Sequence, residues 1–126
     1  MEVNLVLILL FIDQPGTYDG SNGESFVILN DIDFGSGSLR IEGCNLGNPL
    51  QIAPGVKLTF NGGNLDLFNT DIILFEGPYP ECHSGTTFGD KWEGMELTSS
   101  RMNFVNSSIS DAKLPLKVGG VTFYCG

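Results

Sequence analysis

Two pairs of acidic residues have the type and spacing that acid–base chemistry requires. Asp31 and Asp33 lie two positions apart, and Glu93 and Glu96 lie three positions apart. On a strand, Asp31 and Asp33 would share one face with their side chains about 7 Å apart. Hydrolysis of a glycosidic bond by acid–base catalysis needs two carboxyl groups that flank the bond. These four residues are therefore the catalytic candidates, and the alternative is that they are solvated carboxylates on a strand face.

Basic and aromatic residues near the second acidic pair are candidates for ligand binding. Arg101 and Lys91 flank the segment that begins at Trp92 and could pair with the carboxylate of an acidic sugar. Trp92 and Tyr79 could stack on sugar rings through their aromatic faces. The alternatives are corner cations on the surface and an indole packed at a corner. We predict Tyr79, Trp92 and Arg101 as the ligand-binding candidates.

Motifs for metals, nucleophiles and phosphates do not occur in the sequence. His83 is the single histidine and stands beside Cys82, and two such residues make a poor metal site. Calcium takes several oxygen ligands, so a pair of carboxylates is a weak start for a calcium site. No G-x-S-x-G elbow or phosphate-binding glycine motif is found. We predict no metal site and no cofactor, with calcium as the alternative.

Composition favours an acidic all-β protein. The 126 residues include 17 Gly and 6 Pro, and the formal net charge is −9. No apolar run keeps helical spacing for more than a turn or two, which favours strands. A negative surface repels nucleic acid and anionic lipid. We therefore expect no nucleic-acid partner and no membrane insertion, and the acidic side chains also oppose association of sheet edges.

The three cysteines leave the redox compartment open. Cys44, Cys82 and Cys125 are too few for a disulfide scaffold and lack the spacing of metal ligands. One disulfide with one free thiol and three reduced thiols are both compatible with this count. The sequence predicts no pairing among them.

Apolar residues recur at fixed spacings along the chain. A shift of 37 residues superposes one alternating run on another: Met95 on Leu58, Leu97 on Phe60, Met102 on Leu65, Phe104 on Leu67, Asn106 on Asn69 and Ile109 on Ile72. A shift about half as long gives further matches: Met95 with Leu114, Leu97 with Leu116, Leu58 with Leu39 and Phe60 with Ile41. We interpret the longer shift as close to two steps of the shorter one. Such recurrence indicates a β-solenoid whose successive rungs stack on one another.

The predicted organisation is a single domain, residues 1–126, in four parts. Residues 1–25 form an N-terminal strand or cap and a loop, 26–76 the first rungs, 77–91 a loop insertion and 92–126 the last rungs. The insertion is predicted because Gly77, Tyr79, Ser84 and Thr86 stand where the pattern expects apolar residues. Insertions in solenoids often carry binding surfaces.

Local signals add three expectations. The stretch Phe26–Phe34 predicts one strand, and Asn-Gly-Gly at 61–63 predicts a corner because these residues tolerate positive φ. Residues 1–12 carry an apolar run too short to span a membrane. We interpret them as a first strand or cap, with a signal segment and a fragment of a longer chain as alternatives.

Three segments together resemble the right-handed parallel β-helix repeat proteins that bacteria secrete. They are IAPGVKLTF at 52–60, WEGMEL at 92–97 and VNSSISDA at 105–112, in the order in which that family uses such segments. The resemblance covers roughly residues 38–124. It implies a single-stranded, right-handed parallel β-helix of about five rungs and an extracellular or cell-surface setting. Family members are usually much longer, and their functions are diverse.

Three functions are compatible with this sequence. The first is a non-catalytic structural or adhesive module of a secreted or cell-surface bacterial protein, in contact with carbohydrate or a protein partner. The second is a fragment of a β-helical polysaccharide lyase or hydrolase that uses the four carboxylates. The third is a solenoid that assembles end to end or edge to edge without a ligand. The lack of a convincing acid–base–cation set favours the first and leaves enzymatic activity uncertain.

Overall fold

The computed structural model describes residues 9–45, 47–75, 91–119 and 122–125, and within them it contains strands and no helix. Every pairing between these strands is parallel.

The strands form three sheets. Sheet A contains β1 (Leu9–Phe11), β3 (Ser25–Ile28), β6 (Leu50–Ile52), β9 (Asp71–Leu74) and β12 (Ser108–Ile109). Sheet B contains β14 (Thr122–Cys125), β11 (Arg101–Val105), β8 (Asn64–Phe68), β5 (Ser38–Glu42) and β2 (Gly16–Asp19). Sheet C contains β13 (Ala112–Gly119), β10 (Trp92–Thr98), β7 (Lys57–Asn61) and β4 (Ile32–Gly35).

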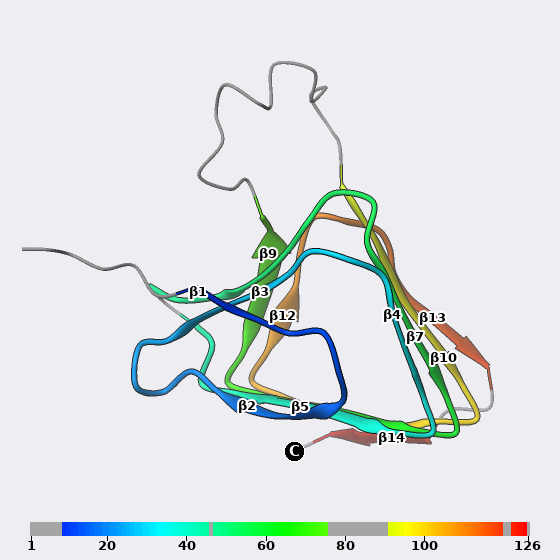
Figure 1. Cartoon of the computed structure of the whole chain (residues 1–126). Coiled ribbons are helices and arrows are strands. Elements are labelled where there is room, and N and C mark those ends of the chain that lie inside the picture. Colours follow the sequence, from blue (N-terminus) through cyan, green and yellow to red (C-terminus); the bar gives the residue numbers. More distant parts are fainter. Residues whose placement is uncertain (1–8, 46, 76–90, 120–121, 126) are drawn as a thin grey trace, which may run out of the picture.

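The chain visits the three sheets in a repeating order. From β3 to β14, consecutive strands belong to sheets A, C and B in turn, so each circuit adds one strand to each sheet (Figure 1). The all-β prediction is confirmed, and a solenoid is consistent with this order of strands. Parallel strands need long connections, and here two other strands supply each one.

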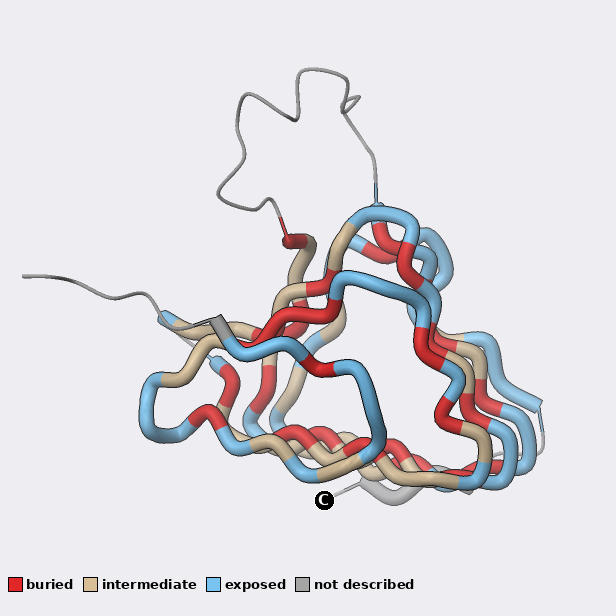
Figure 2. Tube along the Cα trace, viewed as in Figure 1, coloured by how far each residue is buried: buried red, intermediate tan, exposed pale blue. Residues whose placement is uncertain are grey.

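Buried and exposed residues alternate along the strands, so that each sheet has one face toward a shared interior and one outer face. In sheet B, Leu39 and Ile41 on β5 and Leu65 and Leu67 on β8 are fully buried, and the residues between them are partly exposed (Figure 2). Successive side chains of a strand point to opposite faces, so every second residue enters the core. The side chains also stack from strand to strand. The rings of Phe34 and Phe60 lie nearly parallel, with their centroids 4.6 Å apart.

Residues in the left-handed conformation form the corners between sheets. Between sheets B and A, Asn69 has φ of 49° and Asn106 has φ of 47°. Asn106 Nδ2 donates to Asn69 Oδ1 at 2.8 Å, so the two amides stack. Gly62 and Ser99, with φ of 77° and 48°, turn the chain between sheets C and B. The corner predicted at 61–63 is therefore confirmed, and small or amide residues occupy it because other side chains resist positive φ.

The longer recurrence is correct, but its interpretation as two steps is wrong. Met95 pairs with Leu58, and Met102 pairs with Leu65, in directly neighbouring strands. The longer shift is therefore a single circuit at this point, and it is long because residues 76–90 lie between β9 and β10. The preceding circuit, which leads from Leu50 on β6 to its partner Ile72 on β9, contains no such segment and is shorter.

The shorter shift does not describe the register. Met95 pairs with Leu116 and Leu97 with Val118, so each true partner lies beyond the residue that this shift predicts. Leu39 pairs with Leu65 in sheet B, whereas Leu58 belongs to sheet C. The apparent matches arise because all strands alternate with a period of two, so several different shifts superpose part of the apolar pattern.

Two N-terminal predictions also need correction. The stretch Phe26–Phe34 is two strands, β3 and β4, separated by a corner at residues 29–31. The predicted loop in residues 13–25 contains β2, which pairs with β5. The Tyr18 ring of β2 packs edge-on against Phe26 at 5.6 Å between centroids. This packing explains a strand in a segment rich in turn residues.

No helix among the described residues has the length and apolar character that crossing a membrane requires. The predicted insertion at 77–91 lies outside the described residues except for Lys91, and the same holds for Tyr79, Cys82 and His83.

Candidate functional site

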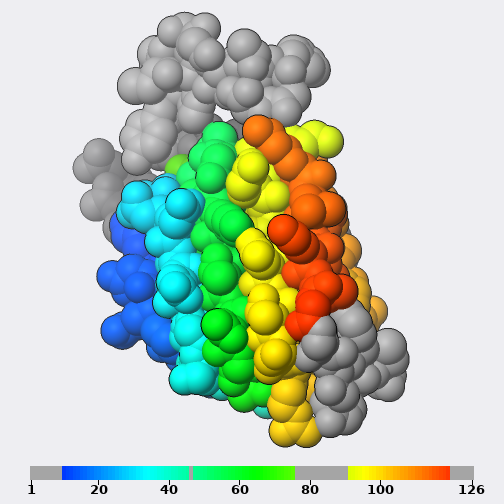
Figure 3. Space-filling view, turned by 90° about the vertical axis from the view of Figure 1, so that its right-hand side faces the viewer, coloured from blue at the N-terminus to red at the C-terminus, as the bar shows by residue number. Residues whose placement is uncertain are grey.

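The outer face of sheet C gathers the candidate carboxylates from distant parts of the sequence. Its strands lie side by side in the order β4, β7, β10 and β13 (Figure 3). Asp33 pairs with Thr59, Thr59 with Glu96, and Glu96 with Lys117, so these four residues form one row across the sheet. Asp31 precedes β4 and is exposed.

An irregularity in β10 brings Glu93 and Glu96 to one side of the sheet. In a regular strand, residues three apart point to opposite faces. Here Gly94 has φ of 121°, and the pairing with β13 skips Pro115, passing from Leu114 to Leu116. A side chain at position 94 would place its Cβ 1.7 Å from the Leu114 carbonyl oxygen, so glycine is required there.

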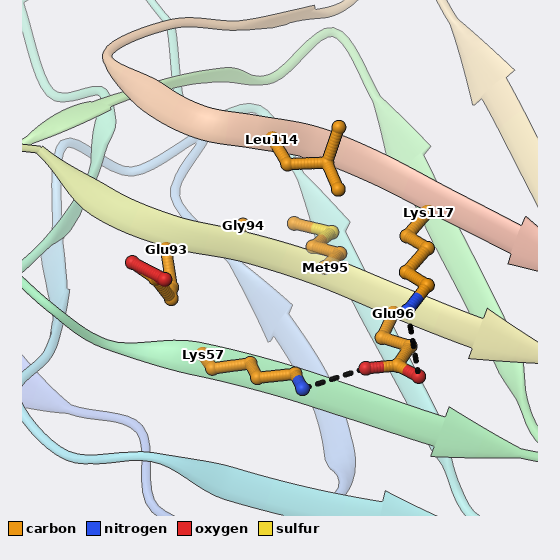
Figure 4. A pocket seen from close by; sticks show the side chains of 7 residues that line it. All are labelled: Lys57, Glu93, Gly94, Met95, Glu96, Leu114 and Lys117. Carbon is orange, nitrogen blue, oxygen red and sulfur yellow. Dashed lines mark ion pairs between the residues drawn. The ribbon is translucent and has the colours of Figure 1, made fainter.

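Lysines pair with both glutamates. Glu96 Oε2 lies 2.6 Å from Lys57 Nζ, and Glu96 Oε1 lies 4.0 Å from Lys117 Nζ (Figure 4). Glu93 Oε2 lies 3.6 Å from Lys113 Nζ. The face therefore carries alternating charges from three strands, and none of these side chains is fully buried.

The pKa shifts of Glu96 and Lys57 favour the charged form of both side chains. The hydrogen bond from Lys57, followed by its positive charge, holds the pKa of Glu96 below the ordinary value. The same pair raises the pKa of Lys57 above its ordinary value. A general acid needs a raised pKa so that it carries a proton at neutral pH. Glu96 therefore lacks the property expected of the acid in a glycosidase pair.

The two aspartates have structural hydrogen bonds. Asp31 Oδ1 accepts a hydrogen bond from the Lys57 backbone N–H at 2.8 Å, which ties the corner before β4 to β7. Asp33 Oδ1 accepts one from the Gly35 backbone N–H at 2.9 Å. The Asp33 bond is local and typical of an aspartate at a turn, whereas the Asp31 bond joins residues that are far apart in the sequence. Both residues are exposed, and the sequence alone gives no sign of their backbone partners.

A shallow hollow of about 200 Å³ lies between these charged groups. It is lined by Lys57, Glu93, Gly94, Met95, Glu96, Leu114 and Lys117 (Figure 4). The missing side chain at Gly94 opens it, and the Lys57–Glu96 ion pair lies at its side. Its polar groups are already engaged with one another.

Sheet B presents a different hollow, of about 330 Å³, on its outer face. Asn64, Asp66, Arg101 and Asn103 line it. Arg101, the ligand-binding candidate, pairs with Asn64 across β11 and β8, and Asn103 pairs with Asp66. The hollow thus combines a guanidinium, a carboxylate and two amides on a flat surface, which suits recognition of polar ligands.

Hydrogen bonds fix part of this hollow. Asn103 Nδ2 donates to Asp66 Oδ1 at 2.7 Å, and Asn64 Nδ2 donates to Ser38 Oγ at 3.2 Å. Next to them, Arg40 lies over the ring of Phe68 at 4.6 Å and bonds to Glu42 at 3.2 Å. The Glu42 hydrogen bond is the largest cause that raises the pKa of Arg40. The face is therefore ordered by contacts across three strands.

Trp92 does not lie on a binding surface, and its candidacy as a ligand-binding residue is corrected. The side chain is fully buried, and its Nε1 donates to the Ser110 carbonyl at 2.8 Å. No face of the indole is left for a sugar ring, so the packing alternative applies. Tyr79 belongs to the residues that the structure does not describe.

Metal and thiol chemistry find no support in the described residues. Among them, no group of three or more His, Cys, Asp or Glu side chains could hold a metal ion such as calcium. Cys44 is buried, and burial raises the pKa of its thiol to about 11. A thiol of that pKa is a poor nucleophile at neutral pH.

Sequence reasoning missed most residues that shape the two hollows. Lys57, Lys117, Asp66, Asn64 and Asn103 gave no signal as single residues. The longer recurrence was the signal that could have found both pairs of the sheet B hollow, because it aligns Asn103 with Asp66 and Arg101 with Asn64.

A scan against protein-family models matched none, and neither the curated proteins nor the solved structures that were searched contained a match to this chain.

Proposed function

We propose that this protein is a right-handed parallel β-helix of about five rungs, and that it is a non-catalytic structural or adhesive module of a secreted or cell-surface bacterial protein. Its carbohydrate-contacting surface is the outer face of sheet B. The observation that carries the proposal is the hollow lined by Asn64, Asp66, Arg101 and Asn103. These are the side-chain types that hydrogen-bond sugar hydroxyls, and adjacent strands hold them in fixed rows.

The state of the carboxylates supports a non-catalytic role. Glu96 is ionised and paired with Lys57, and Asp31 and Asp33 bond to backbone N–H groups. Acid–base cleavage needs one protonated and one ionised carboxyl group at the reacting bond. Glu96, whose pKa is lowered by the hydrogen bond from Lys57, does not suit the first of these roles.

An enzymatic alternative rests on a specific observation. Asp31, Asp33, Glu93 and Glu96 lie on one outer face together with Lys57. A row of carboxylates beside a lysine is the arrangement expected of a polysaccharide lyase or hydrolase fragment. Binding of a substrate would have to displace the Lys57–Glu96 ion pair for this set to act.

A second alternative is assembly without a ligand. Leu114 and Val118 on β13 are about half exposed, at 53% and 46%. In the described residues β13 is the last strand of sheet C, and an uncovered strand with apolar side chains favours pairing with another chain.

The test is a panel of neutral and acidic oligosaccharides, scored for binding and for depolymerisation in the same wells, with and without calcium. We expect binding without cleavage. Binding should be weakened by Asn103→Ala on sheet B and unchanged by Glu93→Ala on sheet C. Cleavage that Glu93→Ala or Asp31→Ala abolishes would establish the enzymatic alternative. A molecular mass that rises with protein concentration, without binding of any glycan, would favour the assembly alternative.

A further inference from the structure

The sequence contains two Asn-Gly pairs, Asn22-Gly23 and Asn61-Gly62. In such a pair the backbone nitrogen of the glycine can attack the side-chain carbonyl carbon of the asparagine, because a short stretch of chain joins the two atoms and a five-membered ring results. Glycine has no Cβ, so its nitrogen approaches with little steric hindrance. Both pairs are therefore candidate sites of covalent modification, and the surrounding structure decides which of them reacts.

Steric access to the two glycines is alike. Gly23 and Gly62 have positive φ, 87° and 77°, and a Cβ built on either would meet no atom within 4 Å. Asn22 and Asn61 are both exposed. The hydrogen bonds of the two glycine nitrogens are different, and a nitrogen engaged with an acceptor has to leave it before it can attack.

The nitrogen of Gly62 is held by the next circuit of the chain. Its N–H donates to the Thr98 carbonyl at 2.9 Å and to the Ser100 hydroxyl at 3.1 Å. Ser100 is buried, and its Oγ also accepts a hydrogen bond from the Gly63 N–H at 3.2 Å. Freeing the Gly62 nitrogen therefore requires the ends of β7 and β10 to separate, and opening of packed, paired strands is costly in a folded protein.

The nitrogen of Gly23 is held within its own turn. Its N–H donates to the Gly20 carbonyl at 2.9 Å, in the connection between β2 and β3 (Figure 1). Asn48 anchors the two sides of this turn, since its Nδ2 donates to the Gly20 and Glu24 carbonyls at 2.6 and 2.9 Å. Gly23 itself lies outside the paired strands, so a local movement of the turn frees its nitrogen, and such movements cost little.

We infer that Asn22 is a site of spontaneous deamidation in the folded protein, and that the pairing of β7 with β10 protects Asn61. The Gly23 nitrogen forms a bond to Asn22 Cγ and gives its proton to water, the Cγ–Nδ2 bond breaks, and Nδ2 takes up a proton and leaves as ammonia. Water then opens the cyclic imide at either of its carbonyl carbons, so the products are aspartate and isoaspartate. The reaction needs no ligand and is independent of the proposed glycan contact.

The modification changes both the charge and the backbone of this turn. It adds a carboxylate between Asp19 and Glu24 in the sequence of a chain whose formal net charge is already −9. The isoaspartate product also carries the backbone through the former side chain, which lengthens the connection between β2 and β3 by one carbon atom. The extent of the reaction at Asn22 therefore records the age of the folded chain.

The test is incubation of the folded chain at neutral pH and physiological temperature, followed by peptide mapping that separates asparagine, aspartate and isoaspartate at each position. We expect Asn22 to react about tenfold faster than Asn61, because local turns open far more often than paired strands. This ratio should fall in concentrated urea. Equal rates in the folded protein, or a faster reaction at Asn61, would overturn the inference. A ratio that persists in urea would also overturn it, since the local sequence and not the fold would then set the difference.

Gly23→Ala is the probe variant, and Gly62→Ala is its matched control because both glycines have positive φ and open surroundings. The methyl group added at position 23 hinders the attacking nitrogen, so we expect the reaction at Asn22 to slow about tenfold. Gly62→Ala carries similar backbone strain and should leave the rate at Asn22 unchanged. An unchanged rate at Asn22 in Gly23→Ala would refute the cyclic imide, and equal slowing in both variants would refute the local control of this site.

Discussion

Sheets B and C present outer faces built by the same repeat but with different hydrogen-bond balance. On sheet C, Lys57 and Lys117 flank Glu96, and the charged groups satisfy one another. On sheet B, Asp66 shares one hydrogen bond with Asn103, and both residues line an open hollow. The more highly charged face is therefore the one on which charged groups pair across strands.

This difference has a physical origin in the strands themselves. Sheet C carries long flexible lysines, and Lys57 reaches diagonally to Glu96, two positions beyond its own partner on the adjacent strand. In the hollow of sheet B, Asn64 and Asn103 have short amides that bond to their directly paired residues, Ser38 and Asp66. The short side chains of sheet B thus leave an open hollow between the paired rows.

The largest expected effect comes from a substitution on sheet C that disrupts the packing of β10 against β13. Gly94→Ala should lower the free energy of unfolding by about 3 kcal/mol or more, since the new Cβ would collide with the Leu114 carbonyl oxygen 1.7 Å away. Gly55→Ala is the control. It shares a positive φ, 79°, but meets no atom within 4 Å, so about 1 kcal/mol is expected. Urea unfolding measures both, and equal losses would contradict the close approach of β10 to β13.

The substitution Trp92→Phe tests whether the Trp92 side chain stabilises the fold by packing or contacts a ligand. We expect a loss of about 2 kcal/mol in the free energy of unfolding, because the buried indole and its hydrogen bond to the Ser110 carbonyl are replaced by a smaller ring. Glycan binding by the folded protein should not change. Tyr18→Phe, which removes a surface hydrogen bond to the Gln14 carbonyl, is the control for a lost polar group. Unchanged stability with weaker glycan binding would restore Trp92 as a ligand-binding residue.

Asn103→Ala tests the sheet B face. The lost bond to Asp66 should cost about 1 kcal/mol or less, because both groups regain water on an outer face. Glycan binding should weaken more than stability does. Chemical denaturation and titration on the same preparation give the two numbers. A variant that loses stability in proportion to binding would mean that Asn103 only maintains the strand pairing.

The smallest expected effect concerns the ion pairs of sheet C. Lys57 lowers the pKa of Glu96, so the folded protein binds this proton less readily than the unfolded chain, where the value is near 4.5. The stabilisation from Glu96 is therefore complete above that value and disappears as the pH falls through the folded-state pKa. We expect Glu96→Gln to lower the urea midpoint slightly near neutrality, less so in high salt, and to match the parent protein in acid. A difference that grows in acid would contradict the sign of this shift.

Much of the fold was predictable because strands and corners depend on short stretches of sequence. The alternating residues Leu58 and Phe60, then Leu65 and Leu67, indicated strands where β7 and β8 are observed, and Asn-Gly-Gly predicted the corner between them. The longer recurrence aligned Met95 with Leu58 because stacked parallel strands repeat the same side of the core. The length of one circuit was not predictable, since corners of different length are compatible with the same alternation.

The candidate sites were less predictable, because they depend on register and on irregular backbone. Glu93 and Glu96 share a face only because β10 is irregular at Gly94, and the sequence shows that glycine without its conformation. Lys57 and Asp66 became relevant only through partners one strand away. Trp92 could pack or bind by its residue type, and only its burial decides between the two.

The uninterrupted register on both sides of residues 76–90 makes this connection a natural position for grafting. Leu58, Leu65 and Ile72 keep their partners in the next circuit regardless of the extra length that this connection adds. Inserting a flexible peptide into a connection costs little, since each doubling of the length of a flexible loop adds about 0.6 kcal/mol. An epitope or a reporter peptide inserted between β9 and β10 would therefore change the length of the chain while the stacked sheets keep their pairing. The protein would then be a display scaffold in which the inserted peptide and the stacked sheets are set by different parts of the sequence.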